Sequence, residues 1–191
     1  LAAVDIAARY PELVSRLALV QTTDWTGFQD WKRKRDPKQI LAKPFAGQFA
    51  MARMAPRRMP QWFELATGAR AQIPHFCACA GEAMASGAQW SLASAYQRFL
   101  AGGDSPVGRP KQPMLVVWGE ADRSHGPGAG ARARMLADDV EIISNADLGH
   151  FSDLEDPARF DAALTRVLAS HPLRSRPRPA VLPLCGKRRE Q

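Results

Sequence analysis

Two side chains with complementary chemistry follow neighbouring apolar segments late in the sequence. Asp122 stands directly after "VVWGEA", and His150 stands in "LGHF", 28 residues later and just beyond "VEIISNA". A carboxylate that hydrogen-bonds one imidazole nitrogen fixes the tautomer of the ring. It also stabilises the imidazolium that forms when the other nitrogen takes a proton. The pair is therefore predicted to be a general base, His150, oriented by an acid, Asp122.

Three short apolar runs are predicted to be the strands that position this pair. They are "RLALVQT" (Arg16 to Thr22), "MLVVWG" (Met114 to Gly119) and "VEIISNA" (Val140 to Ala146). The first run has no amphipathic alternation, which favours a strand buried on both faces of a parallel sheet. Adjacent parallel strands lie about 4.8 Å apart, so loops at their same ends can bring Asp122 and His150 together.

Helical patterns alternate with these runs. Residues 1–12 have helical spacing that closes at Pro11, and residues 126–138 are predicted to be a loop leading into a helix. Asp156 is a good N-cap with Pro157 at the first helical position, and Phe160, Leu164 and Val167 form the stripe of the last helix. This order predicts an α/β fold with a mostly parallel sheet, in which ligand chemistry gathers at the carboxyl ends of the strands.

The middle of the chain, about residues 25–110, differs in character. It is rich in Met, Trp and Phe, and prolines at 37, 44, 56, 60 and 74 predict breaks between several short helices. Two accounts of the large apolar side chains stay open. They form a helical core, or some of them line an apolar substrate pocket.

The distribution of charge argues against a nucleic-acid partner. The chain carries a net charge of +7, but six basic side chains against Glu190 give residues 171–191 a charge of +5, which leaves +2 for the other 170 residues. That Pro/Arg-rich tail is typical of disorder. The sequence has neither an apolar run long enough to cross a membrane nor a signal peptide at its start. A cytoplasmic location is the expectation.

Other candidate motifs are weaker. Cys77 and Cys79 in "HFCAC" lack the spacing and second ligand pair of a zinc site, and small buried cysteines are the expected account. The glycines at 126, 128 and 130 lack the phosphate-binding patterns, so a flexible loop is expected. His125 competes with His150 for the role of base, but it precedes this Gly/Pro-rich loop and is the weaker candidate. We expect no metal and no organic cofactor.

These segments together resemble the α/β-hydrolase superfamily, in its cap-bearing branch of esterases, dehalogenases and epoxide hydrolases. "VVWGEAD" resembles the strand that delivers the acid of a catalytic triad, and "LGHFSDLEDP" resembles the histidine loop. "LAAVDIAARYPELVSRLALVQT" resembles the helix after the nucleophile elbow and the next strand. The resemblance implies core elements in residues 1–24, a helical cap insertion in 25–110, the acid and histidine loops in 111–170, and the tail in 171–191.

This chain departs from the pattern of that family at the nucleophile. It sits in G-x-S-x-G on a strand-to-helix turn, and no such pentapeptide occurs here. Ser105 and Ser124 each have only one of the two flanking glycines, Ser105 lies in a linker, and no strand leads into Ser124. The resemblance therefore implies the C-terminal portion of the fold, with a serine or aspartate nucleophile upstream of Leu1.

The expected function is hydrolysis of a small, largely apolar ester or related substrate. A non-catalytic binding module that keeps the fold without the chemistry is the alternative. Residues 1–191 made alone are expected to be inactive and to aggregate, because a three-strand remnant has an unpaired edge and an exposed apolar face.

Overall fold

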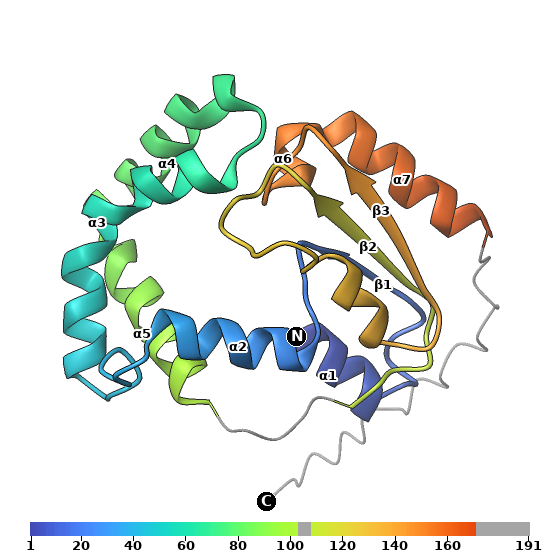
Figure 1. Ribbon diagram of the computed structural model, residues 1–191, viewed down its shortest axis with the longest axis horizontal. Coiled ribbons are helices and arrows are strands. Elements are labelled where there is room, and N and C mark those ends of the chain that lie inside the picture. Colours follow the sequence, from blue (N-terminus) through green and yellow to red (C-terminus); the bar gives the residue numbers. More distant parts are fainter. Residues whose placement is uncertain (103–107, 171–191) are drawn as a thin grey trace, which may run out of the picture.

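The computed structural model describes residues 1–102 and 108–170, and within them it is a mixed α/β structure around one parallel sheet (Figure 1). The predicted fold class is confirmed. The interpretations of Ser105 and of the tail at 171–191 lie outside the described residues.

The sheet has three parallel strands in the order β1-β2-β3. They are β1 (Leu17–Val20), β2 (Met114–Gly119) and β3 (Val140–Asn145), close to the predicted runs. Val117 of the central strand pairs with Val20 on one side and Ile143 on the other. All six residues of β2 are buried, whereas β1 buries only Leu17. The prediction that the first strand is buried on both faces is wrong, because β1 lies at an edge of the sheet.

Helices cover both faces of the sheet. On one face, α1 (Ala2–Arg9) and the 3-10 helix η2 (Ala131–Met135) pack against alternate side chains of the strands, among them Met114 and Val116. On the other face, Val167 of α7 (Pro157–Ser170) packs against Leu115 and Val117. The helix predicted within 126–138 is thus only a short 3-10 turn. The start of α7 at Pro157 is confirmed.

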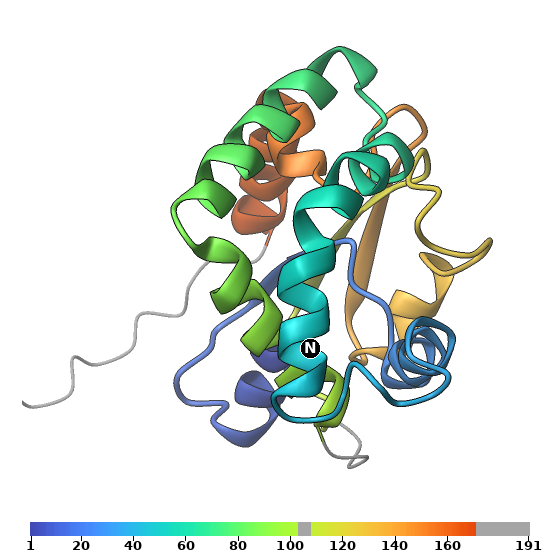
Figure 2. The same cartoon turned by 90° about the vertical axis from the view of Figure 1, so that its left-hand side faces the viewer.

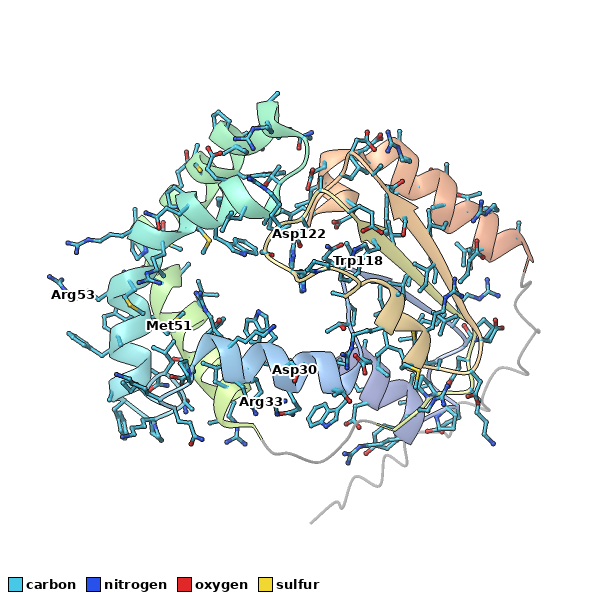
Figure 3. The ribbon with its side chains drawn as sticks, in the orientation of Figure 1. Asp30, Arg33, Met51, Arg53, Trp118 and Asp122 are labelled. Carbon is cyan, nitrogen blue, oxygen red and sulfur yellow. The ribbon has the colours of Figure 1, made fainter. Side chains whose placement is uncertain are left out.

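The chain between β1 and β2 forms a helical segment, defined here as residues 25–101. It contains α2 (Trp25–Arg35), α3 (Ala46–Ala66), η1 (Arg70–Gln72), α4 (Ile73–Ala85) and α5 (Ala88–Ala101). Figure 2 shows α3 and α5 side by side, and their contact buries Met51, Ala52 and Ala93. Figure 3 shows Met51 pointing inward from α3 and Arg53 pointing outward.

The predicted breaks at Pro56 and Pro60 are wrong, because α3 runs through both residues. Each proline removes one backbone hydrogen bond of the helix and costs about 3 kcal/mol in an isolated helix. Burial of Met51, Ala52, Ala55 and Phe63 along α3 offsets that cost. Pro74 lies in the first turn of α4, where its missing N–H costs little.

Among the described residues, no helix combines the length and the apolar character that a membrane span requires.

Candidate active site

Asp122 and His150, predicted to meet, lie in hydrogen-bonding contact beyond the carboxyl ends of β2 and β3. The distance from His150 Nδ1 to Asp122 Oδ2 is 2.8 Å. The Asp122 side chain is fully buried, whereas 28% of the His150 side chain remains exposed. Nδ1 therefore faces a fixed carboxylate, and the Nε2 edge of the ring is left for a reacting group. Figure 3 shows Asp122 and Trp118 near this end of β2.

The Asp122 carboxylate accepts two further hydrogen bonds. Gln21 Nε2 donates to Oδ2 at 3.0 Å, and the backbone N–H of Ser124 donates to Oδ1 at 2.7 Å. Burial, the largest single influence, raises the pKa of this carboxyl. The hydrogen bonds from His150 and Ser124 together outweigh burial and leave the pKa below its usual value. Asp122 is thus held ionised beside the imidazole.

Gln21, which the sequence analysis did not single out, connects β1 to this acid. Its side-chain amide is paired with both backbone groups of Gly119, and its Nε2 also reaches Asp122. The residue is buried and has a φ of 49°, a left-handed conformation that is costly for a residue with a Cβ. A polar side chain directly after an apolar strand was the available signal.

The histidine loop is held by close backbone packing against the end of α3. The N–H of His150 donates to the carbonyl of Ala66 at 2.7 Å. A Cβ on Gly149 would lie 2.0 Å from the same oxygen and 2.6 Å from the nitrogen of Gly68. The structure requires glycine at this position because two backbone segments touch, and not because of a left-handed conformation, since Gly149 is not among the residues with positive φ.

Glu155 is a second residue that sequence reasoning missed. Its buried carboxylate accepts hydrogen bonds from Gly68 N and Ala69 N, at 2.8 and 2.7 Å, after α3. It also accepts from the backbone N–H groups of Gly149 and Phe151, on either side of His150, at 3.1 and 3.3 Å. One carboxylate therefore joins the helical segment to the histidine loop. The letters "LEDP" carry no sign of the partners after α3, which lie 86 and 87 residues away.

Aromatic rings surround His150 on the side of the helical segment. Trp62 of α3 and Phe151 each lie 5.2 Å from the imidazole, centroid to centroid, in edge-to-face contact. Phe63 and Phe76 pack behind Phe151. Some of the large apolar side chains of the helical segment therefore reach the site, while others, such as Met51, only fill its core.

His125 also belongs to this cluster. Its ring is nearly parallel to that of His150, with centroids 5.5 Å apart, and its Nε2 lies 3.7 Å from Asp122 Oδ2. That distance is too long for a hydrogen bond. Burial lowers the pKa of His125, and the charge of His150 adds to this effect against the opposing influence of Asp122. His150, rather than His125, is the imidazole that Asp122 holds.

A cavity of about 340 Å³ opens beside His125, between α2 and the loop that precedes η2. Trp31 and Asp30 line it from α2, and Ser124, His125 and Arg132 line it from the loop side. The ligand atoms of Asp122, His125 and His150 all lie within 4.8 Å of one another, which makes these three residues a possible cation site. The glycine-containing loop after His125 enters a 3-10 helix and has a positive φ at Gly128.

The expectation of buried cysteines is wrong for this part of α4. Cys79 is exposed and Cys77 is only partly buried. The helix presents this face to solvent and buries Ile73 and Met84 instead.

Known structures share this architecture. A probable hydrolytic enzyme from Pseudomonas aeruginosa PAO1 superposes with a TM-score of 0.62 at 21% identity, over 87% of this chain and 59% of its own. An epoxide hydrolase from Bacillus megaterium superposes with a TM-score of 0.57 at 13% identity, over 87% and 65%. An alpha/beta hydrolase enzyme from a Medee basin deep-sea metagenome library gives 0.54 at 15%, over 91% and 63%.

The chain has an α/β-hydrolase-like fold. No family model matches the sequence, and no curated protein matches it significantly. The chain spans 59–65% of the length of these three solved structures. Within the α/β-hydrolase-like fold, the Asp122–His150 pair lies at the carboxyl edge of the parallel strands, where ligands bind in open α/β sheets.

Proposed function

We propose that this chain is part of a hydrolase in which His150 is the general base and Asp122 orients it. The observation that carries the proposal is the 2.8 Å contact between His150 Nδ1 and a fully buried carboxylate. With Nδ1–H donated to Asp122, the Nε2 lone pair can take a proton from a nucleophile and return it to a leaving group. Ionised Asp122 stabilises the imidazolium between these two transfers.

The nucleophile is proposed to be a serine or an aspartate in a segment outside residues 1–191. Among residues 1–102 and 108–170, no Ser, Thr or Cys side chain hydrogen-bonds to His150. The nearest serine in sequence to the acid, Ser124, uses its backbone N–H to hold Asp122. A serine would form an acyl-enzyme, whereas an aspartate would open an epoxide or displace a halide as it forms an alkyl-enzyme ester, which water then hydrolyses.

The proposed substrate is a small, largely apolar ester or a related compound. Trp62 and Phe151 give the exposed side of His150 an aromatic boundary, against which an acyl or alkyl group would be shielded from water. Residues 25–110 would then act as the cap over the site, with α3 carrying Trp62.

The test uses the complete protein to which residues 1–191 belong, purified with and without His150→Ala. Hydrolysis of p-nitrophenyl acetate and butyrate is followed by absorbance, and opening of styrene oxide by chromatography. The variant is expected to lose at least about a thousandfold in kcat, as when the base of a triad is removed. His75→Ala, on exposed α4, is the matched control and should keep the wild-type rate.

Equal turnover by wild type and His150→Ala would remove His150 from the mechanism. Binding of ester analogues without any turnover by the wild type would instead favour a non-catalytic binding module. Mass spectrometry of the protein after brief exposure to substrate then separates an acylated serine from an alkylated aspartate.

A further inference from the structure

We propose that Asp122, His125 and His150 form a binding site for a divalent transition-metal cation, best suited to Zn²⁺. Metal binding is independent of the proposed function. Its consequence, inhibition of the proton shuttle, depends on that function. The observation behind the proposal is His125, which converges on the same carboxylate oxygen as His150 but has no role in the hydrolase mechanism.

The type of ligand fits zinc. Two imidazoles and one carboxylate are a donor set that suits Zn²⁺ better than Ca²⁺ or Mg²⁺, which prefer oxygen ligands. Three protein ligands with one open position are the usual arrangement of zinc sites that also bind water or a small molecule. Within the described residues, this is the one group of at least three such side chains whose ligand atoms lie close enough together.

The distances also fit. Zn–N and Zn–O bonds of about 2.0–2.2 Å in tetrahedral geometry place neighbouring ligand atoms about 3.3–3.5 Å apart. In this structure, Asp122 Oδ2 lies 2.8 Å from His150 Nδ1 and 3.7 Å from His125 Nε2. All three ligand atoms lie within 4.8 Å of one another, so the imidazoles need to move by up to about 1.5 Å, a shift that rotation of the side chains supplies.

The surroundings hold the central ligand in place. Asp122 Oδ1 accepts from Ser124 N, and Gln21 Nε2 donates to Oδ2. Such outer hydrogen bonds orient ligating carboxylates in metal sites. The cavity of about 340 Å³ that His125 lines provides access for the ion and space for a water molecule at the open position.

The position of the proton on His150 determines what a bound metal would do to catalysis. His150 Nδ1 carries the proton that hydrogen-bonds Asp122, so coordination through Nδ1 requires the other tautomer, in which the single ring proton moves to Nε2 and no net proton is released. Nε2 then has no lone pair to take a proton from the nucleophile, and the metal-bound ring cannot become the imidazolium needed for catalysis. A bound zinc ion would act as a reversible inhibitor that a chelator removes.

The binding test uses the complete protein to which residues 1–191 belong and Zn²⁺ in competition with a chromophoric chelator. A second N/S pair must first be removed, because Cys79 Sγ lies 3.7 Å from His75 Nε2 on the exposed face of α4. In the His75→Ala/Cys79→Ser background we expect one zinc ion per chain. Addition of His125→Ala or His150→Ala should weaken binding by at least about tenfold, the loss seen even for outer hydrogen-bond partners.

His125→Gln keeps a polar side chain of similar reach beside Trp118. It should weaken zinc binding as much as His125→Ala does. Circular dichroism checks that each variant is folded. Co²⁺ adds a spectroscopic readout. Tetrahedral visible bands without a thiolate charge-transfer band are expected in the wild-type chain when one equivalent is bound. The proposal would be overturned if His125→Ala left the zinc affinity unchanged. It would also be overturned if His75→Ala/Cys79→Ser alone abolished zinc binding.

The inhibition arm uses the complete protein. Zn²⁺ should inhibit ester hydrolysis, a chelator should restore it, and His125→Ala should raise the zinc inhibition constant by at least about tenfold, whatever its basal rate. Binding without any measurable hydrolysis would leave the metal site standing and count against the hydrolase. Hydrolysis that bound zinc does not slow would leave the hydrolase standing and overturn the inhibitory role of the metal.

Discussion

The helical segment is tied to the sheet layer at two junctions that use charge in different ways. At its start, Asp24 caps α2 by accepting from Gly27 N, and it also pairs with Arg132 of η2 at 2.7 Å. After α3, Gly68 N and Ala69 N donate to Glu155. The first junction joins two side chains, and 40% of the Arg132 side chain is exposed. The second joins backbone to one buried carboxylate.

The two junctions therefore have different roles: the first attaches the helical segment to the sheet layer, and the second positions the histidine loop. An exposed guanidinium can follow its partner, so the Asp24 junction tolerates movement of α2 and is weakened by salt. Backbone N–H groups cannot follow, so the Glu155 junction fixes the end of α3 against the histidine loop to within a hydrogen bond. The residues on both sides of His150, Gly149 and Phe151, share that same carboxylate. The second junction is therefore the one that places the imidazole.

Removal of the Glu155 carboxylate is expected to have the largest effect. Glu155→Ala leaves several backbone donors without a partner, each at a cost of roughly 1–3 kcal/mol, so the free energy of unfolding should fall by at least about 3 kcal/mol. Glu155→Gln should lose less, because one oxygen still accepts. Urea unfolding of the complete protein, followed by circular dichroism, measures both changes.

Asp153→Ala, on the same short helix α6, is the matched control because Asp153 accepts none of these bonds. Equal losses in Asp153→Ala and Glu155→Ala would show that α6 itself, rather than the carboxylate, supports the loop. In the complete protein, the Glu155→Gln variant should lose kcat with little change in KM, because a misplaced base affects the chemical step.

The backbone contact at the same junction gives the second prediction. Gly149→Ala places a methyl group 2.0 Å from Ala66 O, and the neighbouring atoms are backbone that cannot move aside cheaply. We expect a loss of about 1–3 kcal/mol in the free energy of unfolding, as for overpacked cores. Gly126→Ala is the control, since nothing lies within 4 Å of its added Cβ and its φ is not positive. A loss for Gly149→Ala no larger than that of the control would mean that the two segments can separate freely.

The contrast between these junctions also shows what the sequence could reveal. The strands, the start of α7 and the Asp122–His150 contact were predictable, because periodicity, capping residues and the geometry of parallel strands are local or general properties. Glu155 and Gln21 were not, since their partners include backbone groups 86 and 98 residues away. The continuity of α3 through Pro56 and Pro60 was likewise decided by packing on α5, which no local pattern records.

The exposure of Cys79 and of most of β1 could not be predicted for a related reason. Residue type indicates what can be buried, but the neighbours of an element decide what is buried. β1 has β2 on one side only in this chain, so three of its four residues keep part of their surface in solvent. Its apolar character remained visible in the sequence, whereas its place at the edge did not.

The Asp24 junction should show the smallest effect and the clearest dependence on conditions. Burial, the largest influence, raises the pKa of Asp24, but the hydrogen bonds from Arg132, Gly27 and Thr23 together leave it below the usual 3.8. A carboxyl with a lowered folded-state pKa contributes stability above its unfolded pKa, and this contribution disappears as the pH falls through the folded value. Asn is an equally good N-cap, so Asp24→Asn removes the charge while keeping the cap. The difference in the free energy of unfolding between wild type and Asp24→Asn should be constant near neutral pH and shrink below about pH 4.

High salt at pH 7 should shrink that difference as well, because Arg132 is exposed. The loss caused by Glu155→Gln should stay constant across the same salt series, since backbone donors carry no net charge and the carboxylate is buried. Parallel salt dependence at the two junctions would contradict the division between them. The helical segment would then be held at both ends by screened charge, and the position of His150 would depend on ionic strength.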